Sequence, residues 1–160
     1  MGMVETMEKM HHTYVRALIV ASVAVLGITV PASAQSVGVR AGASGSPDQF
    51  YVGAHAEAGP VVEDLLFRPN LEIGIGNDIT LVAVNLEFVY PFPLGDTEWR
   101  FYPGAGPALN IYRFNERTKT EGGFNILLGL EHEDGFMLEL KVGALDSPDV
   151  KFGIGYTWRP

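Results

Sequence analysis

The sequence contains no cysteine, which excludes disulfide bonds and thiolate metal sites. Basic residues are also scarce, because 11 Lys and Arg stand against 19 Asp and Glu and the net charge is −8. This balance argues against a nucleic acid as partner, since binding to a phosphate backbone requires clustered Lys and Arg. No long stretch shows a helical period, and one long apolar run is present, at residues 17–30.

The apolar run has the features of a secretory signal peptide. Arg16 precedes it, and Pro31 and the small residues "ASA" at 32–34 follow it. A transmembrane anchor is the alternative, but the run is shorter than the roughly 20 residues that a spanning helix needs. We therefore predict a signal peptide at 1–34, cleaved between Ala34 and Gln35.

The remaining chain, 35–160, is long enough for one domain and too short for two. The leader holds two acidic and two basic residues, so its removal leaves the net charge at −8. Export without cysteine is typical of a bacterial envelope protein and not of a secreted domain stabilised by disulfides.

Residues of the mature chain alternate in character with a period of two, which predicts β-strands. Turn-type residues separate eight such segments, at 36–43, 50–58, 67–76, 79–90, 99–112, 124–132, 136–143 and 150–158. Pro103 and Pro107 lie inside one of them, and a proline cannot donate to a strand ladder. We therefore expect a bulge or kink in "YPGAGPAL" at 102–109.

The two faces of these strands differ in chemistry. One face is apolar from the first strand to the last and carries no charged residue. The other combines eleven glycines with a balanced set of charges, which we predict to form a network inside the fold: Arg40, Glu57, Arg68, Glu72, Glu87, Arg100, Glu131, Glu139, Lys141 and Lys151.

Side-chain volume indicates which face points inward. An eight-stranded interior is only just wide enough for side chains to fill it or for one small ligand. The many aromatic, Leu, Ile and Val side chains of the apolar face would overfill it, whereas glycine and paired charges fit. Alternating segments of about ten residues are typical of outer-membrane barrels. We predict an all-β fold, an eight-stranded antiparallel up-and-down transmembrane β-barrel; a soluble periplasmic barrel that binds an apolar ligand is an alternative.

Aromatic residues gather at the predicted strand ends, as in the two interfacial girdles of membrane barrels. With both termini in the periplasm, the predicted periplasmic girdle is Phe67, Tyr90, Trp99, Phe136, Tyr156 and Trp158. Phe50, Phe124 and Phe152 would lie near the outer ends.

The stretches "RPNLEIGIG", "EFVYPF", "WRFYPGAGPALNIY" and "FGIGYTW" resemble the small bacterial outer-membrane β-barrel proteins of OmpA and OmpX type. The resemblance implies an outer-membrane location, contact with outer-membrane lipid, and insertion by the barrel-assembly machinery. In such families a last strand ending in an aromatic residue is the assembly signal, which the resemblance places at Phe152, Ile154, Tyr156 and Trp158. Arg159 and Pro160 depart from that pattern. We expect a monomer.

Few residues could support chemistry, and we predict no catalytic, cofactor-binding or metal-binding residue and no cofactor. The alternative is a lipid-modifying barrel enzyme in which His55 activates Ser44 or Ser46. The sequence "EHEDG" at 131–135 does not converge on a metal, because adjacent strand residues point to opposite faces. The lumen charges could form a polar pathway, but we expect them to fix the packing of a filled interior. Among the predicted outer loops, only 113–123 is long enough to present a surface. With so little loop, we expect a structural or interaction role and not a specific receptor.

Overall fold

The structure is a computed structural model that describes residues 34–114 and 117–159. Residues 1–33, which make up most of the predicted signal peptide, lie outside the described residues, as do 115–116 and Pro160. Within the described ranges, no helix is long and apolar enough to cross a membrane.

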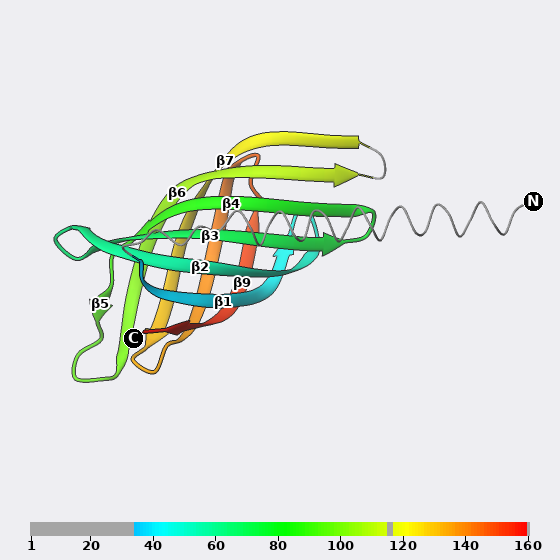
Figure 1. Ribbon diagram of the computed structural model, residues 1–160. Helices are drawn as coiled ribbons and strands as arrows, with labels where there is room; N and C mark the ends of the chain where they lie inside the picture. Colours follow the sequence, from blue (N-terminus) through cyan, green and yellow to red (C-terminus); the bar gives the residue numbers. More distant parts are fainter. Residues whose placement is uncertain (1–33, 115–116, 160) are drawn as a thin grey trace, which may run out of the picture. The chain divides into compact units, whose positions relative to one another are not determined.

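Nine strands make up the described chain, and eight of them are long (Figure 1). β5 is a two-residue strand that pairs only with β6. The bounds are β1 Ala34–Gly45, β2 Gln49–Val62, β3 Leu65–Gly76, β4 Ile79–Val89, β5 Phe92–Pro93, β6 Trp99–Phe114, β7 Arg117–His132, β8 Phe136–Leu145 and β9 Val150–Trp158.

The eight long strands close into an antiparallel barrel. Each long strand pairs with the next long strand along the chain, so β4 pairs with β6 and not with the short β5. β1 pairs with β9 from Val37↔Trp158 to Gly45↔Val150 and closes the barrel. Closure leaves no open sheet edge within the barrel wall, which a membrane-spanning sheet requires. The predicted all-β, eight-stranded antiparallel fold is therefore confirmed.

The prediction of a loop at 113–123 is wrong, because most of these residues belong to strands. β6 continues to Phe114, β7 begins at Arg117, and the two pair from Phe114↔Arg117 down to Leu109↔Gly122. Thr118, Thr120 and Ile111, which lies opposite Thr120, have high strand propensity. The hairpin reaches as far as the start of β4, where Ile79 pairs with Phe114, and it extends beyond β8, whose pairing with β7 stops at Gly123↔Leu145.

The bulge or kink predicted in "YPGAGPAL" takes the form of an interrupted ladder to β4, without a shift of register. β6 keeps one register against β7 from Trp99↔His132 to Phe114↔Arg117. The prolines act on the other side, where the ladder to β4 is interrupted between Asn85↔Ala108 and Phe88↔Ala105. The missing N–H of Pro107 thus weakens one ladder without bending the strand out of register.

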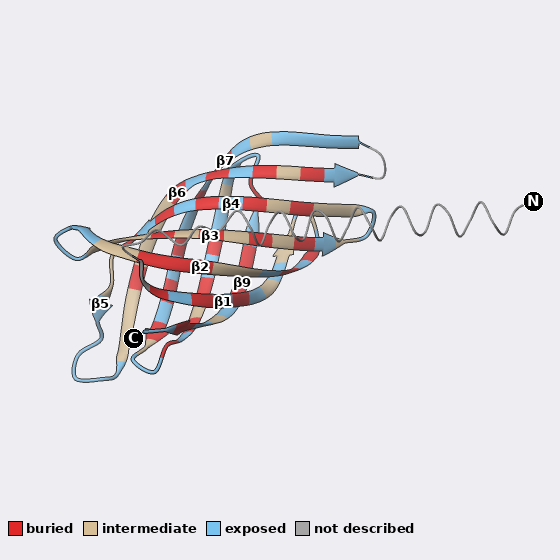
Figure 2. Cartoon of the chain, in the orientation of Figure 1, coloured by how far each residue is buried: buried red, intermediate tan, exposed pale blue. Residues whose placement is uncertain are grey.

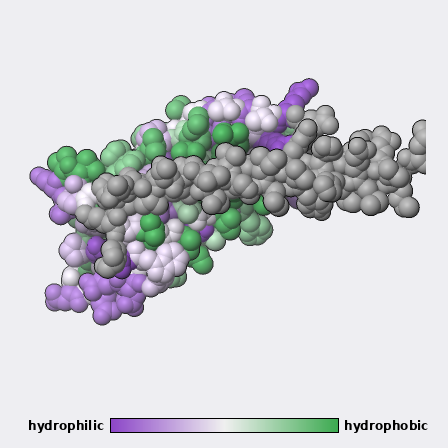
Figure 3. Space-filling model, in the orientation of Figure 1, coloured by the Kyte–Doolittle hydropathy of each residue, from purple (hydrophilic) through white to green (hydrophobic). Residues whose placement is uncertain are grey.

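Burial is inverted relative to a water-soluble protein. On β4, Asn85 and Glu87 are fully buried, whereas the alternating Leu86 and Phe88 are 44% and 38% exposed. Figure 2 shows this alternation along the strands, and Figure 3 shows apolar side chains on the visible face with hydrophilic ones near both ends. The alternative of a soluble barrel with an apolar interior is therefore wrong.

Candidate functional site: a closed polar lumen

The lumen contains a central cluster of three cations and three carboxylates. Arg40 Nη1 lies 2.7 Å from Glu139 Oε1, Lys141 Nζ lies 2.8 Å from Glu87 Oε1, and Lys151 Nζ lies 2.7 Å from Glu72 Oε2. Lys141 also contacts Glu72 and Glu139, so the pairs form one network. All six side chains are buried, and their formal charges cancel.

A second cluster lies toward the end of the barrel at which β1 begins and β9 ends, which we call the periplasmic end because the sequence predicts that orientation. Arg68 pairs with Glu57 and donates to Glu131 at 3.0 Å. Its guanidinium carbon lies 4.5 Å from the centre of the Tyr102 ring, a cation–π contact. Ser36 donates to Glu57 at 2.6 Å. The Arg68 Nη1 to Glu139 Oε2 distance of 4.0 Å joins this cluster to the central one.

Asparagine side chains add further hydrogen bonds across the barrel. Asn125 donates to Asn85 at 2.8 Å, Asn85 donates to Asn70 at 2.6 Å, and Asn70 donates to Glu87 at 2.7 Å. Tyr102 adds a hydrogen bond to Glu139 at 3.1 Å. These bonds matter because a buried charge is tolerated only when its remaining lone pairs are satisfied. We call the two clusters and these residues the charged lumen.

The structure thus brings together nine of the ten predicted network residues, and Arg100 is the exception. Its side chain is only half-buried, and within residues 34–114 and 117–159 it makes no ion pair. Its strand partner Glu131 is bound to Arg68 and Arg159 instead.

Arg159 closes the periplasmic mouth and was missed as a site residue from the sequence. Its guanidinium pairs with Glu131 and lies 3.9 Å from Glu57. A signal for this role exists, because Arg159 continues the inward parity of Lys151, Gly153, Gly155 and Thr157 on β9. The residue that departs from the family pattern therefore has a specific place at the mouth of the lumen.

The β8–β9 turn closes the opposite, outer mouth with neutral groups. Ser147 and Pro148 are buried in the barrel opening. Asn110 donates to the carbonyl of Asp146 at 3.0 Å and to Ser147 Oγ at 3.2 Å, and the Tyr112 hydroxyl donates to Asp146 O at 2.7 Å. Leu81 and Ala83 pack beside Tyr112. We call this region the neutral outer end.

The hypothesis of a His55–serine pair is wrong. His55 lies opposite Gly38 in the β1–β2 ladder, and its Nε2 is 3.0 Å from Thr157 Oγ1 near the periplasmic end. Ser44 lies opposite Gln49, six residues away along β2, which is about 20 Å at strand spacing. The period of two gives the face of His55 correctly, but its height along the barrel follows from the register.

The side chains of "EHEDG" point to different parts of the barrel. Glu131 is engaged in the lumen, while His132 contacts Glu98 at 3.0 Å and Asp134 at 3.3 Å on the exposed side. In the part of the chain that the structure describes, no three His, Asp or Glu side chains are placed to hold a metal ion.

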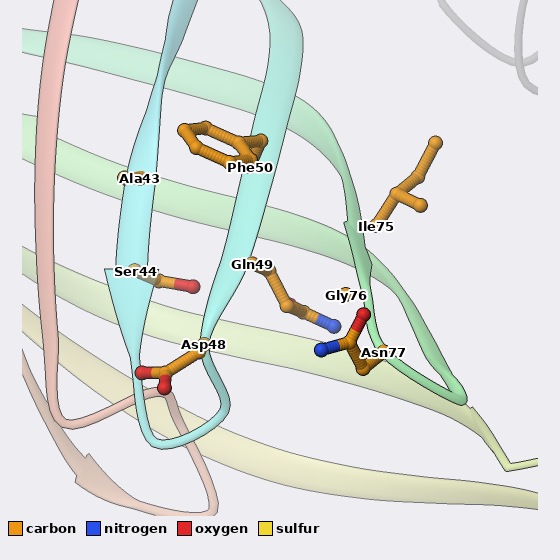
Figure 4. A pocket seen from close by; sticks show the side chains of 8 residues that line it. All are labelled: Ala43, Ser44, Asp48, Gln49, Phe50, Ile75, Gly76 and Asn77. Atoms are coloured by element: carbon orange, nitrogen blue, oxygen red, sulfur yellow. The ribbon is translucent and has the colours of Figure 1, made fainter.

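A rim pocket of about 490 Å³ lies between the β1–β2 and β3–β4 turns (Figure 4). Phe50 and Ile75 line it with exposed apolar side chains, and Asp48, Gln49 and Asn77 add polar groups. Gln49 is buried, and its Nε2 has no hydrogen-bond partner within the described chain. A lining of this kind can contact both the apolar chain and the polar headgroup of an amphiphilic molecule.

The residues of the predicted girdle form contacts at the periplasmic end. Trp99 and Phe136 have ring centroids 6.3 Å apart, Phe136 lies opposite Tyr156, and Tyr156 lies 5.3 Å from Trp158. Phe67 and Tyr90 extend this set through Phe88 and Phe92, at 5.1 Å and 4.7 Å. The aromatic residues of the predicted girdle therefore lie at or next to strand ends, in separate groups of ring contacts.

These features define a class: a closed β-barrel with an apolar exterior, an ion-paired interior and both lumen mouths covered. Three solved structures share the fold. The N-terminal β-barrel domain of Pseudomonas aeruginosa OprF is 15% identical over 78% of this chain and 98% of that one, with a TM-score of 0.52. Neisserial surface protein A (NspA) is 15% identical over 78% and 95%, with a TM-score of 0.57.

The outer membrane enzyme PagL is 12% identical over 78% of this chain and 99% of that one, with a TM-score of 0.50. No protein-family model and no curated protein sequence matches the chain. At these identities the likeness establishes the fold, that of the small outer-membrane barrels of Gram-negative bacteria. Because one such fold carries enzymes as well as non-enzymes, activity has to be argued from the site.

Proposed function

We propose that the chain is a non-catalytic outer-membrane β-barrel with a structural role in the envelope of a Gram-negative-type bacterium. The observation that carries this proposal is the combination of an exposed apolar wall with a lumen whose charges are paired and whose mouths are both covered. Such a barrel spans the membrane because its backbone is satisfied internally and its exterior suits hydrocarbon.

Two experiments test this placement. Heat-modifiable migration on a gel after detergent extraction is expected for a folded membrane barrel, with the protein in the outer-membrane fraction. Recovery in the aqueous periplasmic fraction would contradict the proposal. In planar bilayers we expect no stable conductance, because an eight-stranded barrel is filled by its side chains.

The same proposal assigns residues 1–34 as a cleaved signal peptide and the last strand as the assembly signal. Phe152, Ile154, Tyr156 and Trp158 point outward and are 39–54% exposed on the folded barrel, so none of them is required by the lumen packing. Trp158→Asp is expected to reduce the yield of folded barrel strongly, whereas Arg113→Asp, on an exposed strand end, is expected not to. If both variants assembled equally well, the assembly-signal hypothesis would be wrong, and these aromatic residues would serve only as part of the girdle.

A lipid-modifying activity is the second candidate, and its support is the likeness of fold to PagL. The pair on which it depended in this chain is not formed, since His55 contacts Thr157 and Ser44 donates to Pro47. Lipid A and phospholipid profiles of cells expressing the protein or its His55→Ala variant are expected to be the same. A lipid product that disappears in the variant would restore the enzyme hypothesis.

A further inference from the structure

The outer end of β7 has a strand neighbour on one side only. Residues 117–122 pair with β6, but β8 begins to pair with β7 at Gly123↔Leu145. Within the described chain no strand lies on the other side of 117–122. Figure 1 shows this stretch beside β6, as the outer strand of the β6–β7 hairpin, which extends past the end of β8. An edge of this kind presents unpaired N–H and C=O groups to an incoming strand.

The hydrogen-bond pattern identifies which residues present those groups. Tyr90 N donates to Pro103 O on the β4 side, whereas Glu133 N donates to Glu98 O on the β7 side. Odd-numbered residues of β6 therefore bond toward β4, and even-numbered ones toward β7. Because even residues of β6 face odd residues of β7, as in Tyr112↔Lys119, the free groups of β7 belong to Thr118, Thr120 and Gly122.

We propose that this edge binds the same edge of a second copy of the chain in an antiparallel pair centred on Thr120. In that register Thr120 faces Thr120 of the second copy, and Thr118 faces its Gly122. All of the outward-facing backbone groups of 118–122 then find partners, which is the β-augmentation mode of recognition.

The charges favour the same register. Centring on Thr120 places Lys119 of each copy opposite Glu121 of the other copy. Lys119 already pairs with Glu121 of its own strand and is 64% exposed, so four charges of alternating sign meet at the contact. A pair centred on Thr118 would instead place Lys119 opposite Arg117, and like charges directly opposite each other are destabilising.

The antiparallel direction determines how the two barrels are arranged. Since β7 continues directly into the barrel wall, antiparallel edges place the two barrels at opposite ends of the contact. The pair therefore joins barrels head to head, in two facing membranes. This last step rests on the proposed outer-membrane placement, whereas the strand pairing itself does not.

Sedimentation of the folded protein in detergent tests the pairing. The wild type is expected to form dimers as its concentration rises. Lys119→Glu and Glu121→Lys are each expected to weaken dimerisation on the order of tenfold, because each converts both cross-strand contacts to repulsion. An equimolar mixture of the two variants is expected to dimerise again, since every opposed pair is then attractive. Arg113→Glu is the matched control, with the same charge change on the opposite face of the hairpin.

Each variant is first checked for folding by heat-modifiable migration. A wild type that stays monomeric at every concentration, or single charge variants that dimerise like the wild type, would overturn the proposal. Clustering of lipid vesicles carrying the protein with its hairpin outward is the expected consequence for membranes. If dimers form in detergent but such vesicles do not cluster, the membrane placement is wrong and the strand pairing stands.

Discussion

The charged lumen and the neutral outer end are both buried, yet different interactions hold them together. In the charged lumen, Arg68 pairs with both Glu57 and Glu131, and removing it would take away their one fully buried cation. At the outer end, Asn110 and Tyr112 bond to the backbone of the β8–β9 turn. The comparison shows that the stability of the charged lumen depends on the balance of buried charges. The stability of the neutral outer end depends on hydrogen bonds to the β8–β9 turn.

The largest expected effect comes from breaking the charge balance. Arg68→Met keeps most of the side-chain volume but leaves Glu57 and Glu131 with only the partly exposed Arg159 as a cation, and it removes the contact with Tyr102. We expect the free energy of unfolding to fall by about 3–5 kcal/mol, as for other broken buried ion pairs. Urea unfolding in detergent micelles, followed by tryptophan fluorescence, measures this; Arg113→Met, at an exposed position, should match the wild type.

Packing density gives the next comparison, between the charged lumen and the outer end of β7. A methyl group added at Gly129 would collide with the ring of Tyr102, whereas one added at Gly122 meets nothing within 4 Å. Gly129→Ala is therefore expected to destabilise the barrel by about 1–3 kcal/mol, and Gly122→Ala to have little effect. Equal stability of the two variants would show that the Tyr102 side chain can move to accommodate the added methyl group, against this prediction.

Asn110→Ala tests the neutral outer end. The substitution removes two hydrogen bonds to the β8–β9 turn and should cost about 1–2 kcal/mol. Because no charge is involved, the loss is expected to be the same at low and high salt, which unfolding titrations at both ionic strengths can check.

Arg159→Ala should give the smallest effect and the opposite salt response. Arg159 is partly exposed at the periplasmic mouth, so its pairing with Glu131 is screened by solvent. We expect a loss of about 0.5–1 kcal/mol at low salt that shrinks at high salt. A loss that is independent of salt would place Arg159 with the neutral contacts and not with the ionic ones.

The period of two carried most of the fold prediction, and its limits are specific. It assigned Glu87 and Phe88 to opposite faces correctly, because strand side chains alternate regardless of context. It could not say that Arg40 meets Glu139, 99 residues away, because such contacts depend on the stagger between strands around the barrel. The same limit misplaced His55 beside Ser44 and missed the burial of Ser147.

The seam between β1 and β9 also determines when the molecule can fold. Val37 pairs with Trp158, so the first strand waits for nearly the last residue of the chain before its free side is satisfied. Contacts of such long sequence separation form slowly, because the chain must pay the entropy of closing the loop first. Until then the charged side chains lack partners and the apolar wall is open to water. The chain is therefore prone to aggregate before the barrel closes. This gives a physical reason for a chaperone to bind it before it reaches the membrane.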